Sequence, residues 1–414
     1  MEKNITDVQR EFLKILKSFM YDEEYHLPEG FTGLPELIEL SRIHNVNAVV
    51  YEQIRQDVLW QEKKMQSLQE QVKRASIYMV MFQVQRTDSF LEVYRRLCEG
   101  GVRPLVVKGL ICRNLYSKPD YRISGDEDML IRREDFEACD RILKENGFQR
   151  EELEEGTIPY EVAYLHPKAR TYIEVHCSLF PENSGAYSFL NDEFSHVFER
   201  CICEEIQGTQ VWTLSPTEHM FYLICHSFKH FLHSGFGIRQ VCDMVMMAEH
   251  YAGQIDWEKI GRKLKRLNMA AFWAGLAEIG KHYLGFEWEK AQYSVKLQKA
   301  DVGAEALLMD LLQGGVYGDS SLERRHSSNV TLAAAKTGKK STVAALKESI
   351  FPPMSYMKRK YEWVQAHSWL LPVAWGVRMF SYFVHSDREK SEGMSGLEIG
   401  MERVELLRKY KIIR

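Results

Sequence analysis

Three acidic side chains, spread over two segments with strand character, constrain this chain more than any other feature of its sequence. Asp126 and Asp128 are separated by one residue ahead of the apolar run Met-Leu-Ile, and Glu174 stands in the alternating segment Tyr-Ile-Glu-Val-His. Alternate side chains of an extended strand share a face, so the two aspartates point the same way and Glu127 points to the other side. With Glu174 on a neighbouring strand as the best candidate for a third acid, the sequence predicts an oxygen-rich cage. Such a cage suits hard Mg²⁺ ions that also hold substrate phosphates.

Strand-like and helical segments alternate around these acids. Apolar and alternating runs predict short strands at 104–108, 127–131 and 169–179. Helical spacing of apolar residues predicts helices at 110–116 and 134–146 between them. The order strand, helix, strand, helix, strand indicates a small mixed α/β domain.

Helical periodicity dominates on both sides of this domain. Before it we expect two or three helices, including a long segment from about 48 to 97 that no proline interrupts. After it, Ser215 and Glu218 form the capping-box pattern of a helix start. The predicted fold class is α+β, a small mixed β-sheet domain flanked by an N-terminal helical region and a large C-terminal helical region. The predicted domain limits are 1–97, 98–212 and 213–414.

Length, charge and cysteine usage narrow the function classes. A chain of 414 residues is too long for one ordinary core, and its net charge of −4 provides no global basic field for nucleic-acid backbones. We therefore expect no nucleic-acid partner. Eight cysteines scattered without Cys-x-x-Cys pairs indicate reduced thiols and a cytoplasmic location. No stretch approaches the roughly 20 apolar residues of a spanning helix, so no stable membrane association is expected.

Several motifs together carry a family resemblance. They are Lys108-Gly109, then Arg122, Gly125, Asp126 and Asp128, then Glu174 and His176. The chain resembles the DNA polymerase β type nucleotidyltransferase superfamily, and within it the bacterial group described as uncharacterised nucleotidyltransferases. That group commonly has a later His-rich helix followed by an arginine and an aspartate, matched here by His226, His230, Arg239 and Asp243.

The resemblance implies an activity and a set of residue roles. The activity is transfer of a nucleoside monophosphate from a nucleoside triphosphate such as ATP to a hydroxyl of a small molecule, peptide or protein, with pyrophosphate leaving. Catalysis and the binding of two Mg²⁺ or Mn²⁺ ions fall to Asp126, Asp128 and Glu174. Nucleotide or phosphate binding falls to Lys108, Gly109, Arg122, Gly125 and His176, and the planar fork of the arginine suits phosphate oxygens.

Two departures from the superfamily pattern keep a second hypothesis open. Members generally follow the first strand with Gly-Ser or Gly-Gly, whose backbone cradles the triphosphate, whereas this chain has Gly109-Leu110. Lys108 is a candidate to compensate by neutralising phosphate charge. The third acid is Glu174, one methylene longer than the usual aspartate. The alternative to an active enzyme is therefore a catalytically lapsed nucleotide- or partner-binding protein with the same fold.

The histidines leave further alternatives open. His176 shares the strand face of Glu174, and it either contacts a phosphate or the acceptor, or orients an acidic neighbour by a hydrogen bond. His226 and His230 are four apart on one helix face, but no glutamate between them and no nearby cysteine pair supports a zinc hydrolase. That helix either lines the cleft, together with Arg239 and Asp243, or belongs to a polar network around a buried Asp243.

Overall fold

The structure is a computed structural model of the chain. It describes residues 5–153, 158–184, 187–233, 235–294, 296–297, 303–315, 354, 357, 367–375, 377 and 396–412. Residues 316–353 of the predicted C-terminal domain, among others, lie outside this set.

Helices form the N-terminal part of the chain. They are α1 (Asp7–Met20), α2 (Leu34–Ile43), α3 (Asn47–Ile54), the short 3-10 helix η1 (Lys63–Met65) and α4 (Gln66–Glu99). Thr6 and Gln9 start α1 with reciprocal side-chain to backbone hydrogen bonds, a complete capping box. The helical content was predicted, but the structure has four α-helices here rather than two or three.

The long segment predicted from about 48 to 97 is interrupted, and tertiary contacts explain why. The Asp57 carboxylate accepts hydrogen bonds from the backbone N–H of Leu27 and of Leu59, both at 2.9 Å. Trp60 follows and is almost completely buried. These contacts hold the chain in a loop between α3 and α4 although the local sequence contains no helix breaker.

One mixed seven-stranded sheet lies at the centre. Its strands are β1 (Leu105–Val107), β2 (Glu127–Leu130), β3 (Gln149–Arg150), β4 (Glu161–His166), β5 (Thr171–His176), β6 (Ile202–Ile206) and β7 (Thr209–Thr213). The spatial order is β3-β4-β5-β2-β1-β7-β6. The pairs β2–β5 and β1–β7 are parallel, and the other four pairs are antiparallel. This mixed sheet among helices confirms the predicted fold class.

The three strands predicted from sequence are the central ones, β5, β2 and β1, and the four outer strands were missed. The outer strands carry many half-exposed polar residues, so their hydrophobic pattern is weak. The β6–β7 hairpin turns through Gln207 and Gly208, both with positive φ. A glycine at such a turn was the available signal for this hairpin.

Two helices connect the central strands, α5 (Gly109–Arg113) and α6 (Phe136–Glu145), both shorter than predicted. A side chain on Gly109 would place its Cβ 2.7 Å from Glu127 Oε2 and 3.1 Å from the Asp126 carbonyl oxygen. Only glycine therefore lets α5 start this close to β2. The residue before it, Lys108, has φ +52° and ψ −114°, a conformation that L-residues rarely adopt. The chain thus bends sharply where β1 ends.

The C-terminal part is helical. Its α-helices are α7 (Pro216–Leu232), α8 (Arg239–His250), α9 (Trp257–Arg266), α10 (Ala270–Tyr283), α11 (Glu305–Gly314) and α17 (Gly396–Lys409). Short 3-10 helices also occur, of which η2 (Pro119–Tyr121), η3 (Arg133–Asp135), η4 (Ser188–Phe194) and η5 (Val197–Glu199) lie in the sheet region and η6 (Ser368–Leu370) lies in the C-terminal part. The helix α7 starts where the sequence predicted, but the predicted capping-box hydrogen bonds are not formed. The Ser215 hydroxyl donates to Glu218 Oε2 at 3.1 Å instead of accepting from the backbone. The other oxygen of Glu218 pairs with Arg200 at 2.8 Å, and this competing ion pair explains the difference.

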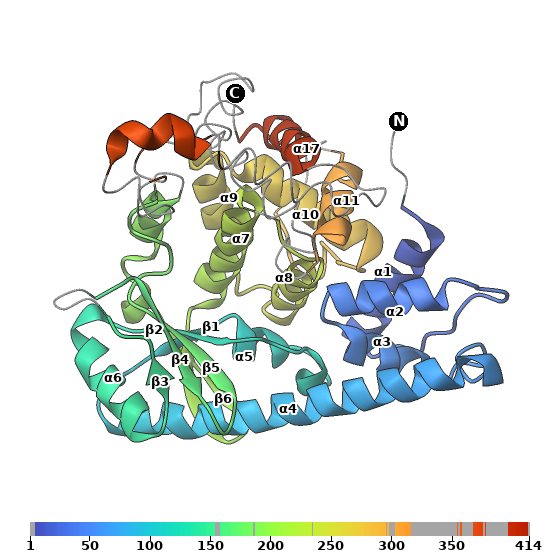
Figure 1. The fold of residues 1–414 in the computed structure, drawn as a ribbon, viewed down its shortest axis with the longest axis horizontal. Helices are drawn as coiled ribbons and strands as arrows, with labels where there is room; N and C mark the ends of the chain where they lie inside the picture. The colour runs from blue at the N-terminus through green and yellow to red at the C-terminus, as the bar shows by residue number, and fades with distance from the viewer. Residues whose placement is uncertain are drawn as a thin grey trace.

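Three layers result from this arrangement (Figure 1). The sheet lies between α4, which runs along the lower edge of the view, and α7 and α8 above it, while α1 to α3 lie beside α8 over the other end of α4. All eight cysteines are free thiols. Within the described part of the chain, no helix combines the length and apolarity needed to cross a membrane. The division at 97 and 212 stays a prediction.

Candidate active site

Strand register brings the candidate acids together. In the parallel pair of β2 and β5, Asp128 lies opposite Glu174. In the antiparallel pair of β4 and β5, Glu161 lies opposite His176. Because Glu174 and His176 are two apart on β5, their side chains share a face with Asp128 and Glu161. Four polar side chains from three adjacent strands therefore meet on one side of the sheet.

A cavity of about 330 Å³ opens between this face, α7 and α8. The predicted site residues that line it are Lys108, Gly109, Arg122, Asp126, Asp128, Glu174, His176, His226, His230, Arg239 and Asp243. Gly125 is absent from the lining. The structure thus gathers all but one of the predicted residues around one space.

Asp128 is the most buried carboxylate of the cavity, with no exposed surface. Its Oδ1 atom accepts from Lys108 Nζ at 2.8 Å and lies 3.0 Å from His176 Nε2. Burial would raise the pKa of Asp128, but Lys108 and His176 together hold it below its ordinary value. Burial likewise opposes the charge of Lys108, whose pKa the carboxylate of Asp128 keeps well above its usual range.

Asp126 and Glu174 lack the close lysine contact that Asp128 has. Burial, reinforced by the negative charges of Asp128 and Asp126, raises the pKa of Glu174 to about 8. Burial and the charge of Asp128 also raise the pKa of Asp126. The strand face therefore carries more negative charge than its own cations neutralise.

The donor set of this face fits a divalent cation. Ligand atoms of Asp128, Glu174 and His176 lie within 4.8 Å of one another. Asp128 Oδ2 is buried and has no hydrogen-bond partner in the described structure, which leaves an acceptor available. A cation at this point would also relieve the repulsion that raises the pKa of Glu174. Asp126 lines the same cavity but does not belong to this close group, so its role as a ligand stays a prediction.

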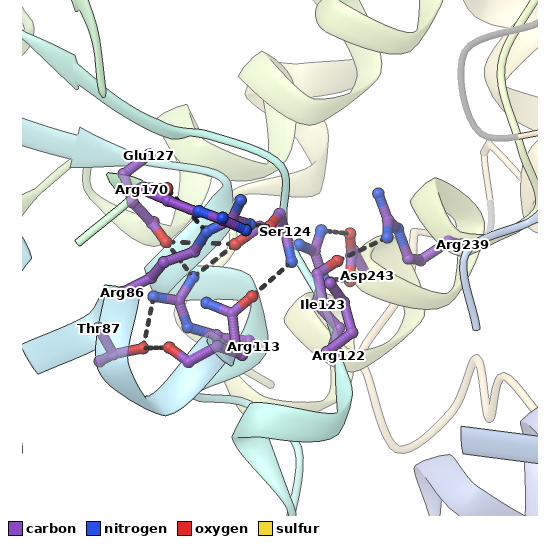
Figure 2. Close-up of polar contacts among 11 residues, drawn as sticks. Arg86, Thr87, Arg113, Arg122, Ile123, Ser124, Glu127, Arg170, Arg239 and Asp243 are labelled. Atoms are coloured by element: carbon purple, nitrogen blue, oxygen red, sulfur yellow. Dashed lines mark hydrogen bonds and ion pairs between the residues drawn. The ribbon is translucent and has the colours of Figure 1, made fainter. Parts of the chain in front are cut away.

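Two arginines anchor the segment that carries the aspartates (Figure 2). On one side, Arg113 from α5 pairs with Glu127 at 2.7 Å and donates to Ser124 Oγ at 2.9 Å. On the other side, both guanidinium arms of Arg122 bond to the two oxygens of Asp243 on α8. Glu127 thus points away from the cavity, as the strand period predicts. The guanidinium of Arg122 is bonded to a protein carboxylate and not to a phosphate.

Asp243 is the centre of a buried polar network. Tyr116 donates its hydroxyl to Asp243 Oδ1 at 2.9 Å, in addition to the arginine contacts. Nearby, Arg239 Nη1 donates to the Ile123 carbonyl oxygen at 2.6 Å, as Figure 2 shows. The sequence left open whether these residues line the cleft or belong to a polar network around Asp243. The structure has the polar network, and Arg239 and Asp243 also line the cavity.

The helix α7 supplies a nitrogen-rich wall. His226 Nε2 and His230 Nε2 are 2.9 Å apart, so one ring donates to the other. Burial, with the charges of Lys108 and Lys229 as further causes, holds the pKa of both histidines well below their ordinary value. Both rings are therefore neutral at physiological pH. No third ligand joins this pair among the described residues, where the only group of three is the one around Asp128.

Ten residues of the cavity lining were missed from the sequence, and those with the largest polar groups are Tyr160, Glu161, Tyr222 and Lys229. Glu161 is the first residue of β4, a strand that was not predicted, and Tyr160 directly precedes it. The alternation in Glu-Val-Ala-Tyr-Leu-His was its available signal. Lys229 stands three residues after His226, and this helical spacing already placed both on one face.

The fold and the cavity define an α/β protein with an acid-lined cleft beneath a helical layer. The chain belongs to the family described as uncharacterised nucleotidyltransferase, whose model matches residues 32–285 and thus more than half of the chain. This confirms the resemblance inferred from the motifs. No curated protein matches the chain. A crystal structure of an antigenic nucleotidyltransferase-like protein from Paracoccidioides brasiliensis is similar at 14% identity and a TM-score of 0.33, over 49% of this chain and 93% of that one.

Proposed function

We propose that this protein is a metal-dependent nucleotidyltransferase that moves a nucleoside monophosphate from a nucleoside triphosphate to a hydroxyl of a small molecule, peptide or protein. The observation that carries the proposal is the pairing of Asp128 with Glu174 on adjacent parallel strands, at the floor of a cavity with excess negative charge. Membership of the family supports the triphosphate as substrate. The cytoplasm remains the proposed location, and neither nucleic acid nor a membrane is proposed as partner.

Asp126, Asp128 and Glu174 would hold Mg²⁺ or Mn²⁺, with His176 as a neighbouring donor to Asp128. Two such ions, when bound, neutralise phosphate charge and lower the pKa of the attacking hydroxyl. Carboxylate oxygens suit these hard ions better than they suit softer metals.

The protein groups divide the remaining work. In the transfer, the acceptor oxygen forms a bond to the α-phosphorus while the bond to the bridging oxygen breaks, and pyrophosphate leaves with the electron pair. The acceptor proton passes to Glu174, which would be ionised and able to accept it once bound cations offset the negative charges that raise its pKa. Lys108 keeps Asp128 ionised through their 2.8 Å contact. His176 orients the same carboxylate from β5.

The second candidate function is a nucleotide- or partner-binding protein that no longer transfers. Its supporting observation is that Leu110, at the position of the usual serine or glycine, has a buried apolar side chain that offers no hydroxyl to a phosphate. Calorimetry with each nucleoside triphosphate and Mg²⁺ separates the two functions. Binding without release of pyrophosphate over a broad acceptor screen favours the binding protein, and sustained acceptor-dependent release excludes it.

Mass spectrometry tests the leading proposal directly. The purified protein and a metabolite and peptide extract are incubated with each of the four ribonucleoside triphosphates and Mg²⁺ or Mn²⁺. We expect one molecule to gain the mass of one nucleoside monophosphate. The double variant Asp126→Asn, Asp128→Asn should lose the gain, whereas Asp88→Asn, an exposed aspartate on α4, should keep it. Equal turnover by the double variant would refute the assignment.

A further inference from the structure

Four cationic side chains among the described residues line the cavity, and three of them are engaged with protein acceptors. Lys108 bonds to Asp128, and Arg122 bonds to Asp243. Arg239 donates to a backbone carbonyl oxygen. Lys229 on α7 forms no ion pair or hydrogen bond with any residue that the structure describes, although it lines the same cavity. Lys229 is half-buried, and its partial removal from water without an acceptor lowers its pKa, so an anionic ligand is its natural partner.

The phosphate grip typical of the superfamily is not available to this chain at the end of β1. The side chain of Leu110 is apolar and only 1% exposed, and it stands where the superfamily has a small residue. The adjacent cation, Lys108, is occupied by Asp128 at 2.8 Å. The helix α5, which begins here, has only five residues. Phosphates must therefore find their counter-charges on another wall of the cavity.

The charges around the histidine pair decide which sign of ligand this wall accepts. The groups that lower the pKa of His226, after burial, are Lys108, His230, Lys229 and His176. Lys108 and Lys229 carry positive charge, which opposes a cation at the pair and favours an anion, while Asp128 acts in the opposite sense on His230. A zinc ion at the pair is disfavoured for the same reason. One neutral ring uses its single N–H within the pair, and the accepting ring keeps its Nδ1–H, which can donate to a phosphate oxygen.

We propose that Lys229, together with the His226–His230 pair, forms the subsite for the β- and γ-phosphates, the part of the nucleotide that leaves as pyrophosphate. This subsite faces the acids of β2 and β5, so the nucleotide spans the cavity from the nitrogen-rich wall to the acid-rich wall. The inference rests on the proposed function, since it names how the triphosphate is held. It makes Lys229 a residue that selects triphosphates over monophosphates.

Calorimetry with inorganic tripolyphosphate, pyrophosphate and AMP, in buffer with Mg²⁺, tests the subsite without requiring catalysis. In Lys229→Met we expect the Kd for tripolyphosphate to rise by about 10- to 100-fold, the usual worth of one charge-assisted hydrogen bond. AMP should bind as it does to the unchanged protein. The variant Lys229→Arg, which keeps the charge, should retain most of the affinity. Lys265→Met removes an exposed lysine of α9 and serves as the matched control, with unchanged binding expected.

The outcomes separate this inference from the proposed function. Unchanged tripolyphosphate binding by Lys229→Met overturns the subsite, and so does a lack of tripolyphosphate binding by the unchanged protein. Loss of binding in Lys229→Met, with retention in Lys229→Arg, supports the subsite even if no acceptor is ever modified. Nucleotide transfer with undiminished tripolyphosphate binding in Lys229→Met would leave the proposed function standing and remove the subsite. Thermal unfolding of each variant identifies any loss of binding that comes from a loss of folding.

Discussion

Two buried arginine–carboxylate pairs flank the same short segment of the chain, yet they join different parts of the molecule. Arg113 and Glu127 are 14 residues apart and connect α5 to β2 within the sheet layer. Arg122 and Asp243 are 121 residues apart and connect the loop before β2 to α8 in the helical layer. All four side chains are at least nine-tenths buried.

The difference between the pairs concerns what each one fixes. Neither Arg113 nor Glu127 lines the cavity, so their pair fixes the conformation of the strand that carries the aspartates. Arg122 and Asp243 both line the cavity, so their pair fixes the helical layer over the strands. Burial raises the pKa of Glu127 in spite of Arg113. A local pair thus secures the acids, and a long-range pair secures the distance between the two cavity walls.

Breaking the local pair should have the largest effect. Arg113→Met leaves Glu127 buried without its counter-charge, and we expect a loss of about 3–5 kcal/mol in the free energy of unfolding. Urea denaturation at neutral pH measures it. The double variant Arg113→Met, Glu127→Gln removes the stranded charge and should recover part of the loss. Equal stability of the single variant and the unchanged protein would show that this pair contributes nothing.

Breaking the pair of Arg122 and Asp243 should lower the free energy of unfolding by less, and it should loosen α8 rather than β2. Asp243→Asn keeps one acceptor for Arg122 but removes the charge, so we expect a loss of about 2 kcal/mol. Hydrogen exchange then sharpens the comparison. Amides of α8 should lose protection in Asp243→Asn, whereas amides of β2 should lose protection in Arg113→Met. Identical exchange patterns in the two variants would mean that both pairs belong to one cooperative unit.

Glu174 is a cavity acid that pairs with no described arginine. Its titration should change the free energy of unfolding less, over one pH unit, than either arginine variant does. Below its ordinary pKa of 4.5 the folded and the unfolded chain both hold the proton. Between there and about 8 the unfolded chain has released the proton while the folded protein keeps it, so stability falls as pH rises. The slope from this one proton is at most about 1.4 kcal/mol per pH unit. Denaturation at pH 6 and 7, with EDTA present, should show a shallower decline in Glu174→Gln; an unchanged slope contradicts the prediction.

The sequence identified the centre of this molecule better than its edges. Asp126 and Asp128 were predicted on one strand face because the period of a strand is local, and Glu174 was the best candidate for a third acid on a neighbouring strand. Glu161 was missed because β4 depends on its pairing with β5, a non-local contact that a weak hydrophobic pattern does not reveal.

The arginine partners could not be predicted from the sequence for a related reason. Arg122 matched a phosphate-binding motif, but its pairing with Asp243 depends on how α8 packs over the loop. Lys229 was visible on the face of His226, yet its lack of a partner is a property of three-dimensional packing alone. Patterns therefore predicted which residues gather at the site, and packing decided which charges remain available.

The helix α4 has a mechanical consequence for the site. Its 34 residues rise by about 51 Å in one unbroken rod. Asn47 of α3 touches it at Met79, and Gln83, one turn further along, accepts the backbone N–H of Ser124 beside the aspartates. Gln83 lies near the middle of α4, so a tilt of about 2° about one end would move this contact by about 1 Å. The position of α4 therefore affects the position of the acids, and the N-terminal helices that pack against α4 help to hold the acids in place from outside the cavity.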